Sequence, residues 1–307
     1  MNKIKRPVQL SLLLLLLSVI NPSVACDICG CANSGSYFGL MPQSHKSIIG
    51  VRYNYLHFET HPDNRILATK ETFNVAEVYG RFFPVKRVQV MAFVPYRFDQ
   101  QATSAVTKKN SGLGDITALA NYNLFNSLMD GSGETAMTHS FMIGGGVKLP
   151  TGRFRYNEND PLQVANANFQ LGTGSLDFIA NAFYTLNWGK WGLSANVSRK
   201  FNTKNAENYR FGDQTYGTAE LFRTFEIGKL NLMPSAGIYA EYTEHGRQNG
   251  AVLDITGGTI VNGTVGLSLF AEKWMVGING QAPIHQKSAS GHVFLRDRFQ
   301  VQLGFLF

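Results

Sequence analysis

The chain has 307 residues, 28 of them basic and 21 acidic, and it contains three cysteines. So few cysteines exclude a disulfide-stapled scaffold for an exported chain of this size. The charges form no basic stripe of the kind that nucleic-acid-binding proteins carry, so we expect no nucleic-acid partner.

The first 25 residues have the three parts of a secretory signal. These are a positive start, an apolar run and a small-residue cleavage site, at Lys3, Lys5, Arg6, 10–20 and Ser23-Val24-Ala25. The apolar run is shorter than the ~20 residues that a transmembrane helix needs. Cleavage after Ala25 would leave 25 basic and 21 acidic residues, which is a net charge of +4. We therefore expect 1–25 to be a signal peptide.

All three cysteines follow at once, in the stretch ACDICGCA at the start of an expected periplasmic head, 26–46. The spacing of Cys26, Cys29 and Cys31 allows thiolates to converge on a soft metal such as Cu(I) or Zn(II). The CxxC pair can equally oxidise to a disulfide in the periplasm. Cys26 also follows the cleavage site as a lipidated cysteine does, although Ser23 stands where lipoprotein signals prefer leucine. Metal clip, redox pair and lipid anchor stay open as three interpretations.

Alternation of apolar and polar residues with period two recurs along the rest of the chain, where helix start and stop signals are scarce. Such alternation is typical of strands with one apolar and one polar face. Segments of this kind lie at 47–57, 71–83, 87–98, 112–125, 137–149, 173–187, 191–201, 214–227, 229–243, 259–272, 274–286 and 297–307. Most are somewhat longer than the ~9–11 residues that cross a membrane at a tilt.

In the stretch RVQVMAFVPYRF, for example, Val90, Val94 and Phe98 share one face, and Gln89 and Arg97 share the other. The count of about twelve segments is even, as in single-chain outer-membrane barrels. The sequence therefore predicts an all-β fold over 47–307. It is an antiparallel up-and-down transmembrane β-barrel of about twelve strands.

The connections between these segments alternate in length along the chain. Long polar connections occupy 58–70, 99–111, 150–172, 202–213, 244–258 and 287–296, and short ones such as FPVK and EKW lie between them. Segment 126–136 is an exception, because it is longer than a tight turn. Outer-membrane barrels have short periplasmic turns and long external loops. We therefore expect the protein in the bacterial outer membrane, with both termini in the periplasm.

The last segment, RFQVQLGFLF, places its apolar residues on one face and ends in an aromatic residue. Phe299, Val301, Leu303, Phe305 and Phe307 make up this face. Such a final strand is typical of bacterial outer-membrane proteins, in which it serves as the assembly signal. We expect the outer-membrane assembly machinery and outer-membrane lipid as partners.

Three motifs occur in a fixed order along the chain. They are Gly112, Gly114 and Asp115 in SGLGDITALANYNLF, then Leu149-Pro150-Thr151-Gly152, then Leu171-Gly172-Thr173-Gly174-Ser175. In this order they resemble the outer-membrane barrel family labelled as the MetA pathway of phenol degradation, and the resemblance covers roughly 47–307. It implies an outer-membrane transporter or channel. The cysteine head lies outside the family pattern.

The polar faces of the expected strands would point into the barrel lumen. The candidate lumen-lining residues are Arg52, Glu77, Arg81, Asp115, Asn121, Asp177, Asn181, Asn196, Glu220, Glu241, Gln281, Gln300 and Gln302. They suit a hydrogen-bonded filling that rigidifies the barrel, and also a solute path whose selectivity they set. Our first hypothesis is a channel or transporter for small solutes, hydrophobic or aromatic ones among them.

Two further hypotheses come from different classes. In the first, the barrel anchors a metal-handling head with copper or zinc at Cys26, Cys29 and Cys31, and another group completes the ligand shell. In the second, the protein is a barrel enzyme of the lipase type with a Ser–His pair. The sequence has no G-x-S-x-G elbow and no haem-binding C-x-x-C-H motif, so we expect neither catalysis nor a haem.

Overall fold

The computed structural model describes residues 46–64, 68–127, 129–130, 137–155 and 167–307. The expected signal peptide and the three cysteines lie outside these residues. The strands are β1 (Ile48–Thr60), β2 (Thr69–Val85), β3 (Val88–Thr103), β4 (Thr107–Leu113), β5 (Thr117–Asn126), β6 (Met137–Lys148), β7 (Asp177–Trp188), β8 (Trp191–Phe201), β9 (Tyr209–Arg210), β10 (Gln214–Arg223), β11 (Phe225–Ile227), β12 (Leu230–Thr243), β13 (Arg247–Gln248), β14 (Ala251–Val252), β15 (Gly258–Ala271), β16 (Trp274–Ser288) and β17 (Val293–Leu306). Two short 3-10 helices are η1 (Ala167–Phe169) and η2 (Ala289–Gly291). Within the described residues, no helix is long and apolar enough to span a bilayer.

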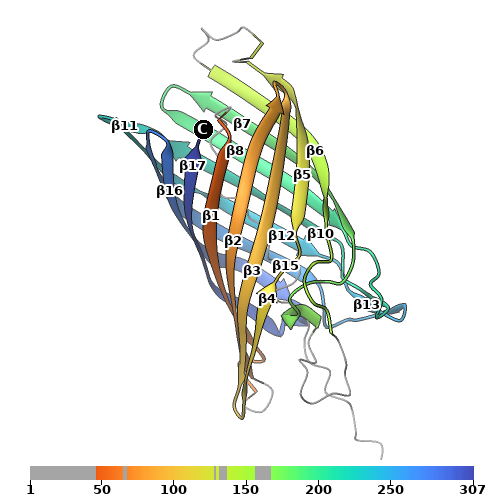
Figure 1. Ribbon diagram of the computed structural model, residues 1–307. Coiled ribbons are helices and arrows are strands. Elements are labelled where there is room, and N and C mark those ends of the chain that lie inside the picture. The colour runs from red at the N-terminus through yellow and green to blue at the C-terminus, as the bar shows by residue number, and fades with distance from the viewer. Residues whose placement is uncertain (1–45, 65–67, 128, 131–136, 156–166) are drawn as a thin grey trace, which may run out of the picture.

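The main sheet closes on itself into a barrel (Figure 1). Each strand pairs antiparallel with its neighbours, β1 pairs with β17 as well as β2, and β10 pairs with β12 as well as β8. Of the 14 strands in this sheet, β4 continues β5 and β11 continues β10, which leaves twelve passes around the wall. The prediction of an all-β antiparallel barrel of about twelve strands is confirmed.

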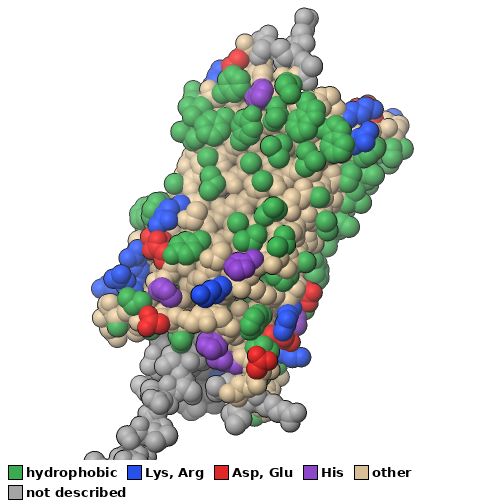
Figure 2. Space-filling model, turned by 180° about the vertical axis from the view of Figure 1, so that it is seen from behind, with side chains coloured by type: hydrophobic (Ala, Val, Ile, Leu, Met, Phe, Trp, Pro, Cys, Tyr) green, Lys and Arg blue, Asp and Glu red, His purple; other side chains and the backbone are tan. Residues whose placement is uncertain are grey.

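Side chains alternate between the two faces of the wall. On β3, the outward Val94, Tyr96 and Phe98 are 38–48% exposed, whereas the inward Arg97 and Asp99 are at most 2% exposed. Hydrophobic side chains are spread over the outer wall, and charged ones gather toward its two ends (Figure 2). Apolar side chains outside and polar ones inside are what a barrel in a bilayer requires.

The two ends of the barrel differ in their connections. At one end, neighbouring strands are joined through residues 86–87, 189–190 and 272–273. Gly189 and Glu272 have positive φ values of 58° and 51°, the conformation that such tight turns need. Phe307 also lies at this end (Figure 1), where its backbone exchanges hydrogen bonds of 3.0 and 3.1 Å with Ser47. The described residues 149–155 and 167–176, and the long connections 202–213 and 244–257, lie at the opposite end.

Some expected boundaries were wrong. Residues 99–111 do not form a long loop, because β3 and β4 continue the ladder on both sides of a short turn, with Ala102 paired to Thr107. Backbone pairing needs no apolar side chains, so a polar stretch can extend a strand beyond the membrane. The expected strand 112–125 breaks between β4 and β5 opposite Pro95, whose missing N–H interrupts the ladder.

Buried apolar side chains inside the barrel form clusters at different levels. One cluster contains Ile48, Tyr79, Met91 and Phe93, and Tyr239 joins it from β12 on the opposite side of the barrel. A second cluster lies toward the long connections, and we call it the outer apolar cluster. It consists of Leu56, Phe58, Phe73, Phe169, Ile260, Ala289, Val293 and Leu295. The interior is therefore apolar in places, and the polar residues lie between and around these clusters.

Candidate functional site

The candidate site is the interior of the barrel, and the predicted lumen-lining residues are buried there. They are Arg52 on β1, Glu77 and Arg81 on β2, Asp115 between β4 and β5, Asn121 on β5, Asp177 and Asn181 on β7, Asn196 on β8, Glu220 on β10, Glu241 on β12, Gln281 on β16, and Gln300 and Gln302 on β17. Asn196 is half-buried, and the others are at most 7% exposed. Their strands surround the interior on nearly all sides.

Arg52 and Glu77 form an ion pair in the middle of the barrel. They are register partners on β1 and β2, and Arg52 Nε contacts Glu77 Oε1. The guanidinium also lies 5.0 Å from the centre of the Phe93 ring and 5.7 Å from that of Tyr79. Burying each of these charges costs desolvation free energy, and the attraction between the two opposite charges offsets that cost.

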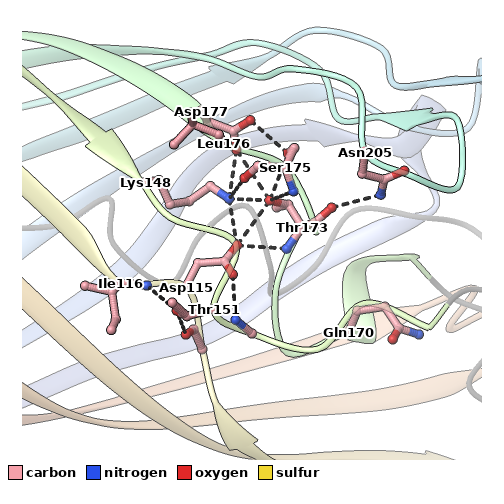
Figure 3. A network of polar contacts seen from close by, with 12 residues as sticks. Asp115, Ile116, Lys148, Thr151, Gln170, Thr173, Ser175, Leu176, Asp177 and Asn205 are labelled. Carbon is pink, nitrogen blue, oxygen red and sulfur yellow. Dashed lines mark hydrogen bonds and ion pairs between the residues drawn. The ribbon is translucent and has the colours of Figure 1, made fainter.

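A second charged network joins Asp115, Lys148 and Asp177 near the end with the long connections (Figure 3). Lys148 Nζ lies 2.6 Å from Asp115 Oδ2 and 2.8 Å from Asp177 Oδ2, and it also contacts Thr173 Oγ1. Ser175 Oγ donates to Asp177 Oδ1 at 2.8 Å. The single ammonium group of Lys148 thus partly neutralises the charges of both buried carboxylates. Hydroxyl and amide donors satisfy the remaining lone pairs.

The same network brings together the three sequence motifs. The N–H of Gly152 donates to Asp115 Oδ1 at 3.0 Å, and the N–H of Thr173 donates to Asp115 Oδ2 at 2.8 Å. Within the β6–β7 connection, Gly152 and Gly172 approach so closely that a Cβ on Gly152 would lie 2.7 Å from the Gly172 Cα. Only glycine allows this approach. The motifs are therefore the parts of one structure, which ties the β6–β7 connection to the strands before it.

The described part of the β6–β7 connection packs against the inner wall. The ring of Phe169 in η1 lies 5.9 Å from that of Phe73, and it is 1% exposed within the outer apolar cluster. Arg97 Nη1 donates to the carbonyls of Gln170 and Leu171 at 3.1 and 3.4 Å. This connection therefore occupies part of the barrel interior at the end with the long connections.

Amide side chains link strands to one another elsewhere on the inner wall. Asn181 donates to Asn121 at 2.8 Å, Gln300 to Asn54 at 2.7 Å, and Asn262 to Gln281 at 3.1 Å. The carboxylates of Glu241 and Glu220 accept from Gln214 at 2.7 Å and from Thr264 at 3.1 Å, and Asn196 donates to Thr218. Buried polar groups need such partners, so each of these predicted residues is fixed by a neighbour.

Two predicted residues remain, Arg81 toward the end with the short turns and Gln302 beside Arg52. Arg81 donates to the carbonyl of Lys46 at 3.3 Å and lies 5.7 Å from the centre of the Phe83 ring. Gln302 is the register partner of Arg52 and of Gly277, and it packs where a side chain at position 277 would stand. A glycine at that position makes room for the glutamine inside the barrel.

Several buried charged residues escaped the sequence analysis. They are Glu71, Arg97, Asp99, Lys148 and Lys200, all at most 5% exposed. The alternation signal was present for Arg97, which shares a face with Gln89, and for Asp99 two residues later. Lys148 directly precedes the L-P-T-G motif, but nothing in the sequence indicates that two aspartates from other segments converge on it.

The alternative hypotheses gain no described site. Among the residues that the structure describes, no three His, Cys, Asp or Glu side chains are placed to bind a metal ion. Cys26, Cys29 and Cys31 lie outside these residues, so their role stays a prediction. Some of the described histidines make pair contacts, such as His139 Nδ1 with Tyr184 Oη at 2.7 Å and the His61 ring 4.6 Å from that of His292.

Solved structures with the same architecture exist. The crystal structure of the COG4313 outer membrane channel from Pseudomonas putida F1 is 16% identical, with a TM-score of 0.63 over 88% of this chain and 100% of that chain. The β domain of the Bordetella autotransporter Brka is 9% identical, with a TM-score of 0.51 over 85% of this chain and 100% of that chain. The fold is that of a bacterial outer-membrane β-barrel.

No curated protein sequence is similar enough to this chain to count as a relative. A family does match, described as "Putative MetA-pathway of phenol degradation", over residues 59–293. This range holds 235 of the 307 residues, and it contains the three motifs that meet around Asp115 and Lys148. The chain therefore belongs to the Phenol_MetA_deg family.

Proposed function

We propose that this protein is an outer-membrane channel for small solutes, hydrophobic and aromatic compounds among them. The observation that carries the proposal is the contrast between the two faces of a closed wall. Val51 and Val78 are 51% and 49% exposed on the outside, while the next register pair, Arg52 and Glu77, is buried inside. Such a wall suits lipid on one side and a polar, selective interior on the other.

The solute class rests on relatives. The family is named after phenol degradation, and the structurally similar Pseudomonas putida protein is an outer membrane channel. The orientation follows from the connections, since short turns belong to the periplasmic side of such barrels. With the turns at 189–190 and 272–273 in the periplasm, Phe307 and Ser47 lie there too, and the β6–β7 connection faces outward.

The proposal is tested with the purified protein in planar bilayers and in proteoliposomes loaded with benzoate or phenol. We expect discrete ion conductance and a solute efflux faster than that of protein-free vesicles. A double variant, Arg52→Ala with Glu77→Ala, should raise the conductance, because it removes both charged side chains from mid-barrel without leaving one unpaired.

The matched control is Val51→Ala with Val78→Ala. It changes the adjacent register pair on the outer face and should leave the conductance unchanged. The folded state of each variant is checked by its heat-modifiable mobility on gels. Folded protein that neither conducts ions nor accelerates the efflux of either solute would rule out the channel.

A second candidate function rests on the sequence of the head. Cys26, Cys29 and Cys31 lie within six residues, a spacing that suits a soft metal such as Cu(I) or Zn(II). Titration of the reduced full-length protein with Cu(I) or Zn(II) should give stoichiometric binding that a Cys29→Ser, Cys31→Ser variant loses. Mass spectrometry of the N-terminus reports cleavage after Ala25, acylation of Cys26 and oxidation of the pair. Unchanged metal binding in the variant would exclude the cysteine head as the site.

A further inference from the structure

A small three-stranded sheet lies beyond the barrel wall, at the end with the long connections (Figure 1). It joins β9, β13 and β14, and in it Arg247 is the register partner of both Arg210 and Val252. Lys204 forms an isolated bridge with Arg210 at the remaining edge. Residues directly opposite each other on antiparallel strands share one face of a sheet. Lys204, Arg210 and Arg247 therefore form a line of three basic side chains, which we call the basic row.

The basic row borders a cavity of about 390 Å³. Arg210 and Arg247 line the cavity from the small sheet, and Tyr242 and Glu244 line it from the end of β12. Tyr242 is 52% exposed on the outer face of the barrel, whereas the adjacent Glu241 is 5% exposed and faces the interior. The cavity therefore belongs to the outer surface of the barrel. Its volume lies within the ~300–1,000 Å³ that is usual for small-molecule sites.

The two carboxylates that line the cavity are already bound to arginines. Arg210 Nη2 donates to Asp213 Oδ1 and Oδ2 at 3.1 and 3.2 Å. Asp213 Oδ1 also accepts from the N–H of Asn202 at 2.9 Å. Arg199 Nη2 on the neighbouring wall donates to Glu244 Oε1 at 2.7 Å. The charge of each carboxylate is thus balanced by an arginine beside it.

Two cations next to the cavity have no such balance. Among the residues that the structure describes, Lys204 and Arg247 take part in no ion pair, and both are exposed. Arg210 stands between them, and like charges directly opposite each other destabilise a sheet. His245 also lines the cavity and adds ring nitrogens. A bound anion would remove the repulsion within the basic row, and the planar fork of an arginine fits phosphate oxygens in particular.

Exposed side chains place the cavity at the border of the membrane. Ile238 and Tyr242 follow each other along the outer face of β12, and both are exposed. Phe178 on β7 and Phe201 on β8 are exposed register partners at the same end of the barrel. Aromatic residues flank the apolar band of outer-membrane barrels at the level where the head groups begin. The basic row lies beyond Tyr242, and therefore at the level of charged head groups.

We propose that this cavity binds a phosphate group of lipid A, the acylated and phosphorylated glucosamine lipid of the outer leaflet. Arg247 and Lys204 bind the phosphate oxygens, Tyr242 packs against the lipid, and the apolar outer face of β12 receives its acyl chains. The site rests on the orientation proposed above, which places the long connections outside, and it is independent of conduction through the barrel. Basic pockets at a membrane surface recognise anionic head groups by this combination of charge and apolar contact.

The first test compares ligands. The protein is refolded in detergent without lipid, titrated with bisphosphorylated lipid A and followed by native mass spectrometry. We expect a complex with one lipid. Lipid A from which both phosphates have been removed should bind about tenfold more weakly, the effect of losing one hydrogen bond to a charged group. An excess of inorganic phosphate should not displace lipid A, because it lacks the acyl chains that lie against β12.

The second test compares variants. Lys204→Gln with Arg247→Gln should weaken the binding of lipid A about tenfold. The matched control is Lys190→Gln with Arg223→Gln, which removes one lysine and one arginine at the end with the short turns. Lys190 lies in the β7–β8 turn, and the Arg223 guanidinium lies 5.1 Å from the centre of the Trp191 ring. This control should keep the wild-type affinity, and both double variants should keep heat-modifiable mobility and wild-type conductance.

Four results would overturn the lipid site. They are equal affinity of the two double variants for lipid A, equal binding of lipid A with and without its phosphates, displacement of lipid A by inorganic phosphate, and tighter binding of phosphatidylglycerol than of lipid A. The third would identify a site for free anions, and the fourth would also overturn the proposed orientation. The comparison of ligands uses the wild type, so it decides the matter even if a variant fails to fold. Ion conductance is measured separately, so loss of the lipid site leaves the channel standing.

Discussion

Asn181 on β7 donates a hydrogen bond of 2.8 Å to Asn121 on β5 across the whole width of β6. The two asparagines are both register partners of Gly144, which stands between them on β6. Because glycine has no side chain, the two amides meet over the intervening strand. A glycine in a strand normally weakens it, and here it allows a polar contact between second neighbours.

This contact predicts the effect of a methyl group at position 144. In a Gly144→Ala variant the Cβ would lie 2.2 Å from Asn121 Oδ1 and must displace that amide. We expect a loss of about 1–3 kcal/mol in the free energy of unfolding, the usual cost of overpacking. Urea unfolding in detergent measures it. Gly280→Ala is the control, since its Cβ would meet only Val265 at 3.9 Å, and an equal loss there would contradict the explanation.

The Lys148 network predicts a larger effect. Lys148→Met leaves Asp115 and Asp177 as buried carboxylates without their ammonium, which costs ~3–5 kcal/mol. We expect the backbone amides of 171–176 to lose protection in hydrogen-exchange mass spectrometry. Adding Asp115→Asn and Asp177→Asn to the same variant should restore most of the protection.

The control for this prediction is Lys229→Met, because Lys229 forms an exposed ion pair with Glu272 and should change nothing measurable. Undiminished protection of 171–176 in Lys148→Met would mean that glycine packing alone holds the connection in place.

From the packing of Phe169 we predict how the β6–β7 connection affects ion conduction. Phe169→Ala removes a buried ring from the outer apolar cluster, where a loss of ~3–5 kcal/mol weakens the docking of η1. If the protein is a channel, we expect larger or more variable single-channel conductance. Phe98→Ala, which removes a ring that is 48% exposed on the outer face, should leave conductance as it is. Identical traces from both variants would exclude η1 as an obstacle to ions.

From the surroundings of His61 we predict that local stability at the end with the long connections depends on pH. Burial, and then the neighbouring His292, lower the pKa of His61 below its ordinary value of 6.5. The contact between His61 and His292 in the folded protein therefore favours the neutral His61 ring. The contribution of this contact to stability is complete above pH 6.5 and is lost as the pH falls through the lowered pKa of His61.

We expect hydrogen-exchange protection of the His61 N–H, which donates to His292 at 2.9 Å, to fall more steeply with acidification in the wild type than in His61→Asn. Asparagine tolerates the positive φ of 48° at this position and does not titrate. Parallel pH profiles would show that the two rings do not interact.

The sequence predicted what depends on local pattern. Alternation in stretches such as RVQVMAFVPYRF is set by the pleat of each strand, so it revealed both faces of the wall and the polar residues that point inward. Loop lengths revealed the two ends. Arg97 and Asp99 were within reach of the same reasoning, because they continue the face of Gln89.

What escaped prediction depends on contacts between distant segments. The convergence of Asp115 and Asp177 on Lys148, and the docking of Phe169 beside Phe73, require the closed register of several strands. The bulges at Ile284 on β16 and Arg296 on β17 also left no sign, since a bulge adds one residue without changing the composition of a strand. Alternation shows which face a residue takes, but not which residue it meets.

The Lys148 network also bears on how the barrel reaches its native alignment. A slip of one residue between two strands turns every side chain of the slipped strand to the other face. Such an error in β6 or β7 would move Lys148 or Asp177 out into the lipid and leave its partners buried and unpaired. The correct alignment is the one in which all three charges meet. The contacts of Lys148 with the two aspartates therefore favour the native alignment of β6 and β7 over a slipped one.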